Sequence, residues 1–221
     1  MPRIKNKGVN GMKAKSESKD IKAFRTKIIK RYLSEVEACI AKVADTEHGT
    51  LEKIIQVLRE AHHKNSQVIT MGNGGSASTA SHFAADMSKA WIEGKFLRYR
   101  SFALTDNLSL MTAWMNDAGY DNMFVGQLES ILTYGDVVFG FSGSGSSKNV
   151  INAIKYANEH GAITVGFTGF DGGDLAKTAQ ICLTVPSNNM RQIEDVHLVF
   201  CHLIKEVLVE ETALMDKERK A

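Results

Sequence analysis

The sequence predicts an α/β fold in which a parallel β-sheet carries helices on both faces. Five short apolar runs alternate with amphipathic helical stretches, at residues 68–71, 100–104, 137–141, 163–167 and 181–185. Each run is continuously apolar, as expected of a strand that is buried on both faces. Regular alternation of such strands with helices is typical of a parallel sheet with helical crossovers.

Two helical patterns precede the first strand, at residues 21–44 and 50–62. Apolar side chains recur at helical spacing in the first, for example Ile28, Leu33 and Val36. Residues 1–20 are rich in Lys, Gly, Asn and Ser and contain almost nothing apolar, which predicts a disordered basic tail. We therefore expect one domain over residues 21–221.

Composition narrows the class of protein. A length of 221 residues suits one sizeable domain, and 27 basic against 25 acidic residues give no reason to expect a nucleic-acid or membrane partner. The three cysteines have no short paired spacing, which excludes a zinc ribbon or disulfide framework. No apolar stretch approaches the ~18–20 residues of a membrane span, and the start lacks the apolar core of a secretory signal. We expect a cytoplasmic protein.

Gly-Ser turns follow the first and third apolar runs, and both are candidate phosphate sites. The first is Gly72-Asn73-Gly74-Gly75-Ser76, and the second extends from Ser142 to Ser147. In a parallel sheet such turns lie at the carboxyl ends of strands, where free N–H groups of a following helix favour an anion. Neither turn matches the dinucleotide GxGxxG or the GxxxxGK[ST] loop, so a sugar phosphate is a better candidate than NAD or ATP.

Two further clusters carry residue types suited to metal binding or proton transfer. His82 and Asp86 are four residues apart and share one helix face, whereas Glu194 and His202 are about two turns apart on another helix. Each also has an ordinary interpretation, because single histidines are usually satisfied side chains and acidic groups near a helix start favour the helix dipole. His197 and Asp195 lie on the same helix and show how easily such spacing arises.

The motifs together resemble those of the bacterial phosphoheptose isomerases in the sugar isomerase (SIS) superfamily. They are Gly72 to Ser76, His82 to Asp86, Thr105-Asp106, Asn116-Asp117, Ser142 to Ser147 with Asn149-Val150-Ile151, Thr168-Gly169 with Asp171-Gly172-Gly173, and Glu194 to His202. The resemblance covers residues 21 to about 210 with consistent spacing.

The resemblance implies a doubly wound, five-stranded parallel sheet and a homotetramer with active sites between subunits. The implied reaction converts sedoheptulose 7-phosphate to glycero-manno-heptose 7-phosphate, for nucleotide-activated heptoses of surface glycans. The implied ligands of one zinc ion per subunit are His82, Asp86, Glu194 and His202. The substrate-binding residues are expected to be Asn73, Gly74, Gly75, Ser76, Asp86, Thr105, Asp106, Ser142, Gly143, Ser144, Ser147 and Glu194.

Isomerisation needs a base, an acid and stabilisation of an oxyanion. We assign Asp86 as the base, His202 as acid and ligand, and zinc as the Lewis acid.

Several positions depart from the family pattern. Asp86 stands where glutamate is usual, Glu194 replaces glutamine, and Gly143 replaces threonine. An arginine usual beyond the first carboxylate has no clear counterpart, and the nearest basic residue is Lys89. Two alternatives therefore stay open: an isomerase of another sugar phosphate, and a non-catalytic SIS protein that binds the replication initiator. His202 disfavours the second alternative, because such non-catalytic relatives typically lack this histidine.

Overall fold

The computed structural model describes residues 19–92 and 95–219. Of the predicted tail at residues 1–20, residues 1–18 lie outside the described part, whereas Lys19 and Asp20 already belong to the first helix. The helices are α1 (Lys19–Thr46), α2 (His48–Lys64), α3 (Gly75–Ser88), α4 (Leu108–Ala118), η1 (Tyr120–Asn122), α5 (Val125–Ile131), α6 (Lys148–Glu159), α7 (Gly173–Thr178) and α8 (Met190–Glu218). The strands are β1 (Gln67–Gly72), β2 (Ala90–Ile92), β3 (Lys95–Leu97), β4 (Arg100–Ala103), β5 (Val137–Phe141), β6 (Ile163–Thr168) and β7 (Ile181–Thr184). The first helix thus begins two residues before its predicted start.

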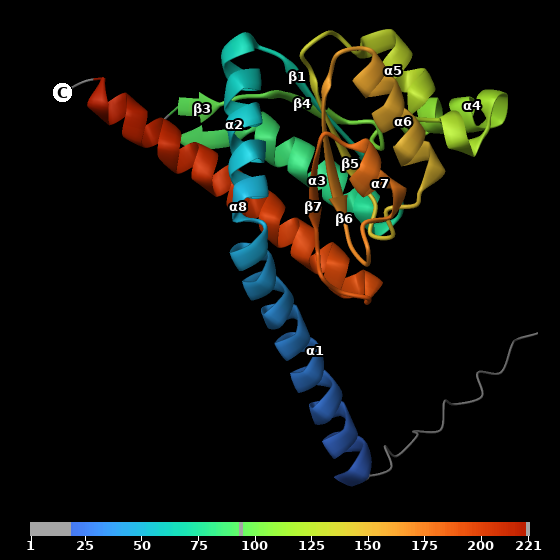
Figure 1. Cartoon of the computed structure of the whole chain (residues 1–221), viewed down its shortest axis with the longest axis vertical. Coiled ribbons are helices and arrows are strands. Elements are labelled where there is room, and N and C mark those ends of the chain that lie inside the picture. Colours follow the sequence, from blue (N-terminus) through green and yellow to red (C-terminus); the bar gives the residue numbers. More distant parts are fainter. Residues whose placement is uncertain (1–18, 93–94, 220–221) are drawn as a thin grey trace, which may run out of the picture. The chain divides into compact units, whose positions relative to one another are not determined.

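The chain divides into two compact units, residues 1–35 and 36–221. In the first unit, the described residues form the amino-terminal part of α1. The second unit contains the sheet and all the other helices, and the site is built within it (Figure 1). The single domain expected over residues 21–221 stays a prediction.

Five parallel strands form the main sheet, in the order β4-β1-β5-β6-β7. Numbered along the chain, this order is 2-1-3-4-5, the doubly wound arrangement of flavodoxin-like folds. The predicted fold class and all five predicted strands are confirmed. The order reverses between β1 and β5, and ligands of such sheets bind beyond the carboxyl ends of strands at this switch point. Both predicted Gly-Ser turns follow these two strands.

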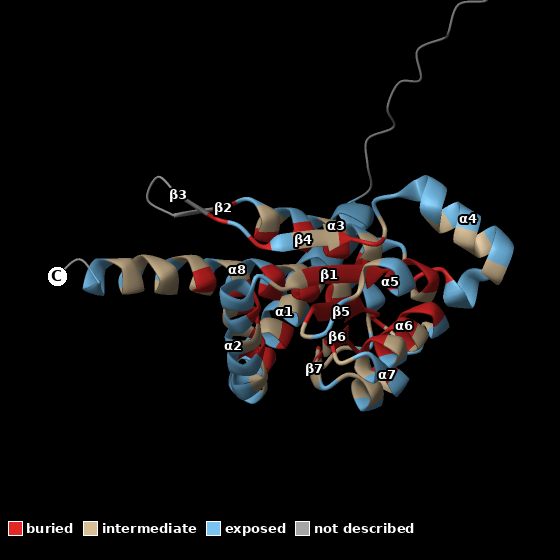
Figure 2. Ribbon diagram, turned by 90° about the horizontal axis from the view of Figure 1, so that it is seen from above, coloured by how far each residue is buried: buried red, intermediate tan, exposed pale blue. Residues whose placement is uncertain are grey.

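Each face of the sheet has its own hydrophobic core. On one face, Phe139 and Phe141 pack with residues of α2, α3 and α8, among them Phe83 and Phe200. On the other face, Val138 packs with residues of α5, α6 and α7. The central strands β1, β5 and β6 are therefore buried on both sides and are largely red in Figure 2, which explains why their sequences are continuously apolar, whereas the edge strands β4 and β7 are only partly buried.

Polar side chains fix the starts of helices α4 and α8. The side chain of Asn107 accepts a hydrogen bond of 3.0 Å from the Leu110 N–H at the start of α4. Asn189 does the same for Arg191 N–H, at 3.2 Å, where α8 begins. Both are N-cap bonds, which satisfy donors that the first turn of a helix leaves free.

The antiparallel pair β2 and β3 was not predicted, because three-residue strands give no usable periodicity. Across the described residues, no helix is both long and apolar enough to span a bilayer.

Candidate active site

The first Gly-Ser turn joins β1 to α3 in a conformation that depends on glycine. Gly74 has φ of +55°, a region that residues with a side chain rarely adopt. A Cβ on Gly72 would lie 2.6 Å from the Ser76 carbonyl oxygen, and one on Gly75 would collide with the Glu194 carboxylate. The turn therefore brings the backbone amides at the start of α3 close to any ligand, with α8 directly behind it.

The serine loop is held in place by bonds to its neighbours. Ser142 donates its N–H to Phe167 O at 2.9 Å and its hydroxyl to Ser147 Oγ at 3.0 Å. Gly143 O accepts the Gly169 N–H at 2.9 Å. These bonds attach the loop to the carboxyl end of β6, so the turns after β1, β5 and β6 form one continuous edge.

A pocket of about 280 Å³ lies between the two Gly-Ser turns and the start of α8. Its lining includes nine of the twelve residues predicted to bind substrate. These are Asn73, Gly74, Gly75, Ser76, Ser142, Gly143, Ser144, Ser147 and Glu194. Phe141 and Met190 complete the lining.

His82, Asp86 and His202 meet where α3 crosses α8. The two histidine Nε2 atoms are 3.0 Å apart, and Asp86 Oδ2 lies 3.4 Å from His82 Nε2 and 3.7 Å from His202 Nε2. The histidine side chains are about half exposed, at 47% and 50%, whereas that of Asp86 is 18% exposed. Among the described residues, this is the group of His, Cys, Asp and Glu side chains placed to hold a metal ion.

These separations fit a tetrahedral ion. Ligand atoms about 2.0–2.1 Å from a zinc ion lie about 3.3 Å from one another, and the three observed distances bracket that value. Although Asp86 is one methylene shorter than glutamate, its carboxylate reaches both histidines. Cys201 lies beside His202, but burial raises the pKa of its thiol, which disfavours the thiolate that a metal would need.

Glu194 lies apart from this cluster. Its carboxylate packs against Gly75 and lines the pocket between the two Gly-Ser turns. Eight residues along a helix correspond to about 12 Å of rise and a rotation of about 80°, so Glu194 and His202 do not face the same point. The structure thus brings together three of the four predicted ligands.

Thr105 and Asp106 are tied to the cluster through Ser81, a residue that the sequence did not single out. The Ser81 hydroxyl lies 2.9 Å from Thr105 Oγ1 and donates to Asp106 Oδ1. Because Ser81 directly precedes His82 on α3, these bonds fix the loop after β4 beside the histidine.

His197 has a structural place. It is fully buried between aromatic rings, and its Nε2 lies 2.9 Å from the Thr168 carbonyl oxygen. Burial lowers the pKa of His197 to about 4, so the imidazole is neutral at physiological pH. Its contact with Thr168 supports the carboxyl end of β6, and His197 is not part of the cluster around His82.

Comparison with known proteins identifies the family of this chain. A family model described as SIS domain matches residues 31–169. The phosphoheptose isomerase of Aliarcobacter butzleri (strain RM4018) is 39% identical over 192 residues, covering 85% of this chain and 98% of that protein. This chain belongs to the phosphoheptose isomerases of the SIS domain family. The predicted family is therefore confirmed.

Two other phosphoheptose isomerases are also similar to this chain, one in sequence and one in structure. That of Roseiflexus sp. (strain RS-1) is 37% identical over 183 residues, covering 80% of this chain and 90% of its own length. The solved phosphoheptose isomerase from Neisseria gonorrhoeae superposes with a TM-score of 0.77 at 28% identity, covering 83% of this chain and 97% of that one.

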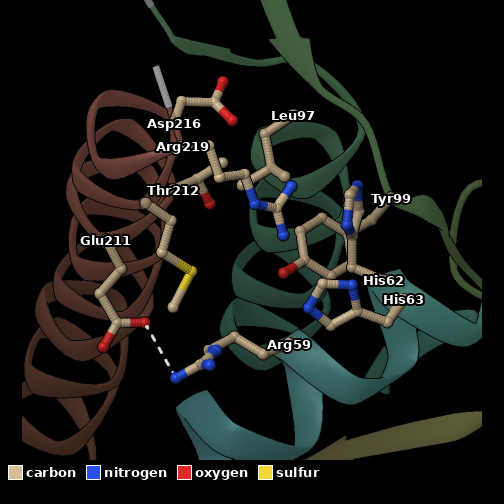
Figure 3. A pocket seen from close by; sticks show the side chains of 10 residues that line it. Arg59, His62, His63, Leu97, Tyr99, Glu211, Thr212, Asp216 and Arg219 are labelled. Atoms are coloured by element: carbon tan, nitrogen blue, oxygen red, sulfur yellow. Dashed lines mark ion pairs between the residues drawn. The ribbon is translucent and has the colours of Figure 1, made fainter. Parts of the chain in front are cut away.

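A second pocket in this isomerase lies between α2 and the carboxyl-terminal part of α8 (Figure 3). Arg59 Nη1 is 3.8 Å from Glu211 Oε2, and the rings of His62 and Tyr99 are 5.0 Å apart. Burial lowers the pKa of His62 and raises that of Tyr99. No predicted site residue lines this pocket, whereas nine of them line the pocket between the two Gly-Ser turns.

Proposed function

We propose that this isomerase interconverts sedoheptulose 7-phosphate and D-glycero-D-manno-heptose 7-phosphate, an aldoheptose phosphate for nucleotide-activated heptose synthesis. The observation that carries the proposal is the cluster of His82, Asp86 and His202 beside a pocket built from two Gly-Ser turns. Two relatives that align with most of this chain are named phosphoheptose isomerase, which is the name of this activity.

The phosphate group binds in the pocket between the turns. The first turns of α3 and α6 contribute free N–H groups and a partial positive charge, and the serine hydroxyls add donors. Glu194 contributes a carboxylate to the same pocket. Because a carboxylate repels phosphate, Glu194 faces the sugar hydroxyls, which donate hydrogen bonds to it.

The reaction moves one proton between two neighbouring carbons. Asp86 removes the proton from C1 of the ketose, giving an enediolate, and a proton is returned at C2 while the hydroxyl proton moves from O1 to O2. Oδ2 of Asp86 is the oxygen that lies near both histidines, and we assign Oδ1 to accept the proton. His202 is the proposed general acid. Its Nε2 faces the cluster, which leaves its Nδ1 to carry the proton.

We propose zinc as the resident ion, which His82, Asp86 and His202 would hold. When bound, such an ion supplies a Lewis acid for the negative charge on the substrate oxygens. Two imidazole nitrogens and a carboxylate oxygen are ligands that zinc accepts readily.

We further propose a cytoplasmic homotetramer with active sites between subunits. The proposal is supported by the half-exposed histidines and by apolar groups beside them on α8, Val199 and Leu203, which are 40% and 43% exposed. Helix α4 has no buried residue and exposes Leu108. Exposed apolar helix faces of this kind are typical of surfaces that another subunit covers.

The test of function is turnover of a panel of ketose phosphates, followed by NMR. We expect the signals of an aldoheptose phosphate to appear from sedoheptulose 7-phosphate and proton exchange with solvent at C2. Turnover of a hexulose or pentulose phosphate instead would assign a different substrate, and failure with every sugar would favour a binding protein. Loss of turnover in His202→Ala with an unchanged oligomer would confirm that the histidine acts in catalysis.

A further inference from the structure

Three side chains form a hydrogen-bonded network that joins the two Gly-Ser turns. Asn73 and Asn149 exchange two bonds, each Nδ2 donating to the other Oδ1 at 2.9 Å. The Tyr120 hydroxyl donates to the same Asn73 Oδ1, also at 2.9 Å. Asn149 is fully buried, and its Oδ1 additionally accepts the Val150 N–H at 3.0 Å. The Asn73 side chain is therefore fixed at both of its polar atoms.

Tyr120 is held by the helix that follows the serine loop. It lies in η1, where the Asp121 carbonyl oxygen accepts a bond of 3.1 Å from Asn152 Nδ2 on α6. Lys148, the first residue of α6, lies 4.0 Å from the Asp121 carboxylate. Tyr120 thus belongs with the second turn, and its hydroxyl reaches across to the first.

Burial does not explain the position of this tyrosine, because 51% of the residue is exposed. The bond to Asn73 is the specific contact that its hydroxyl makes. The first turn needs such a restraint, since Gly72, Gly74 and Gly75 leave its backbone with more conformational freedom than other residues would.

We infer that Tyr120 is a positioning residue for the isomerase reaction, which fixes Asn73 and so sets the distance between the two phosphate-binding turns. The inference rests on the proposed function of that pocket. Because the turns hold the sugar phosphate in the ground state and the transition state alike, loss of the restraint weakens substrate binding more than it slows the chemical step.

The test is Tyr120→Phe, which removes one hydroxyl and keeps the ring. A net loss of one hydrogen bond predicts a rise of about three- to tenfold in KM for the sugar phosphate, with kcat within about twofold. The Kd of inorganic phosphate, measured by calorimetry, should rise by a similar factor. Tyr134→Phe is the matched control, because that residue is 89% exposed and lies outside the pocket, and it should behave as wild type.

A double-mutant cycle separates positioning from general stability. In an Asn73→Ala background the acceptor is gone, so Tyr120→Phe should change neither KM nor phosphate affinity further. An unchanged KM in the single variant, or an equal loss in both backgrounds, would overturn the inference. If the wild type fails to turn over the heptulose phosphate while phosphate affinity still depends on Tyr120 through Asn73, the proposed substrate is wrong and the positioning role stands.

Discussion

Replacing His197 should remove a large part of the dependence of stability on pH. The side chain is fully buried, and because the Thr168 carbonyl only accepts, Nε2 carries the proton and the ring is neutral. Nδ1 has no hydrogen-bond partner among the described residues. Protonating it would place an unpaired charge among aromatic rings, which is why burial lowers the pKa of His197.

The size of the effect follows from the two pKa values. A drop from 6.5 to about 4 is worth about 3 kcal/mol of unfolding free energy, at roughly 1.4 kcal/mol per pH unit. Between these values the unfolded chain binds more protons than the folded one. Stability contributed by the neutral ring is therefore complete above pH 6.5, is lost as the pH falls, and stops changing below about pH 4.

Urea unfolding at pH 7.5 and pH 5.0, at one fixed protein concentration, measures this contribution. We expect the wild type to lose about 2 kcal/mol more than His197→Gln over this interval, because the amide can still donate to Thr168 but does not titrate. Equal losses in the two proteins would show instead that His197 has the same pKa in the folded and the unfolded chain.

Two further substitutions test the site. Ser81→Ala removes the hydroxyl that holds Asp106, and we expect kcat/KM to fall about tenfold with an unchanged melting temperature; unchanged kinetics would contradict a positioning role. Gly75→Ala places a methyl group against the Glu194 carboxylate, a flexible group that will move aside, so calorimetry should show little change in melting temperature while kcat/KM falls about tenfold or more. Gly49→Ala is its control, since a Cβ there has no atom within 4 Å, and an equal kinetic loss in this variant would count against the site.

The fold could be predicted from the sequence because a strand that is buried on both faces of a parallel sheet has a continuously apolar sequence. The runs at residues 137–141 and 163–167 are apolar at nearly every position, and they became β5 and β6 within one residue of the predicted limits. The strands β2 and β3 could not be predicted, because three residues are too few to show a repeating pattern of apolar side chains.

The site was predicted less evenly. Spacing of four residues placed His82 and Asp86 on one face of α3, as the structure confirms, but only tertiary packing could bring His202 of α8 to them. Ser81 and Tyr120 act through contacts with distant parts of the chain, over 25 and 47 residues of sequence. No local pattern encodes such contacts.

We propose that the cluster of His82, Asp86 and His202 is the reaction centre and works with one bound zinc ion. The direct measurement is turnover of sedoheptulose 7-phosphate by metal-stripped protein as zinc is added in known amounts. We expect activity to rise linearly and to level off at one zinc per chain, and His82→Ala to bind zinc weakly and stay inactive. Full activity of the stripped protein, or zinc-dependent activity that survives in His82→Ala, would show that this cluster is not a zinc-dependent reaction centre.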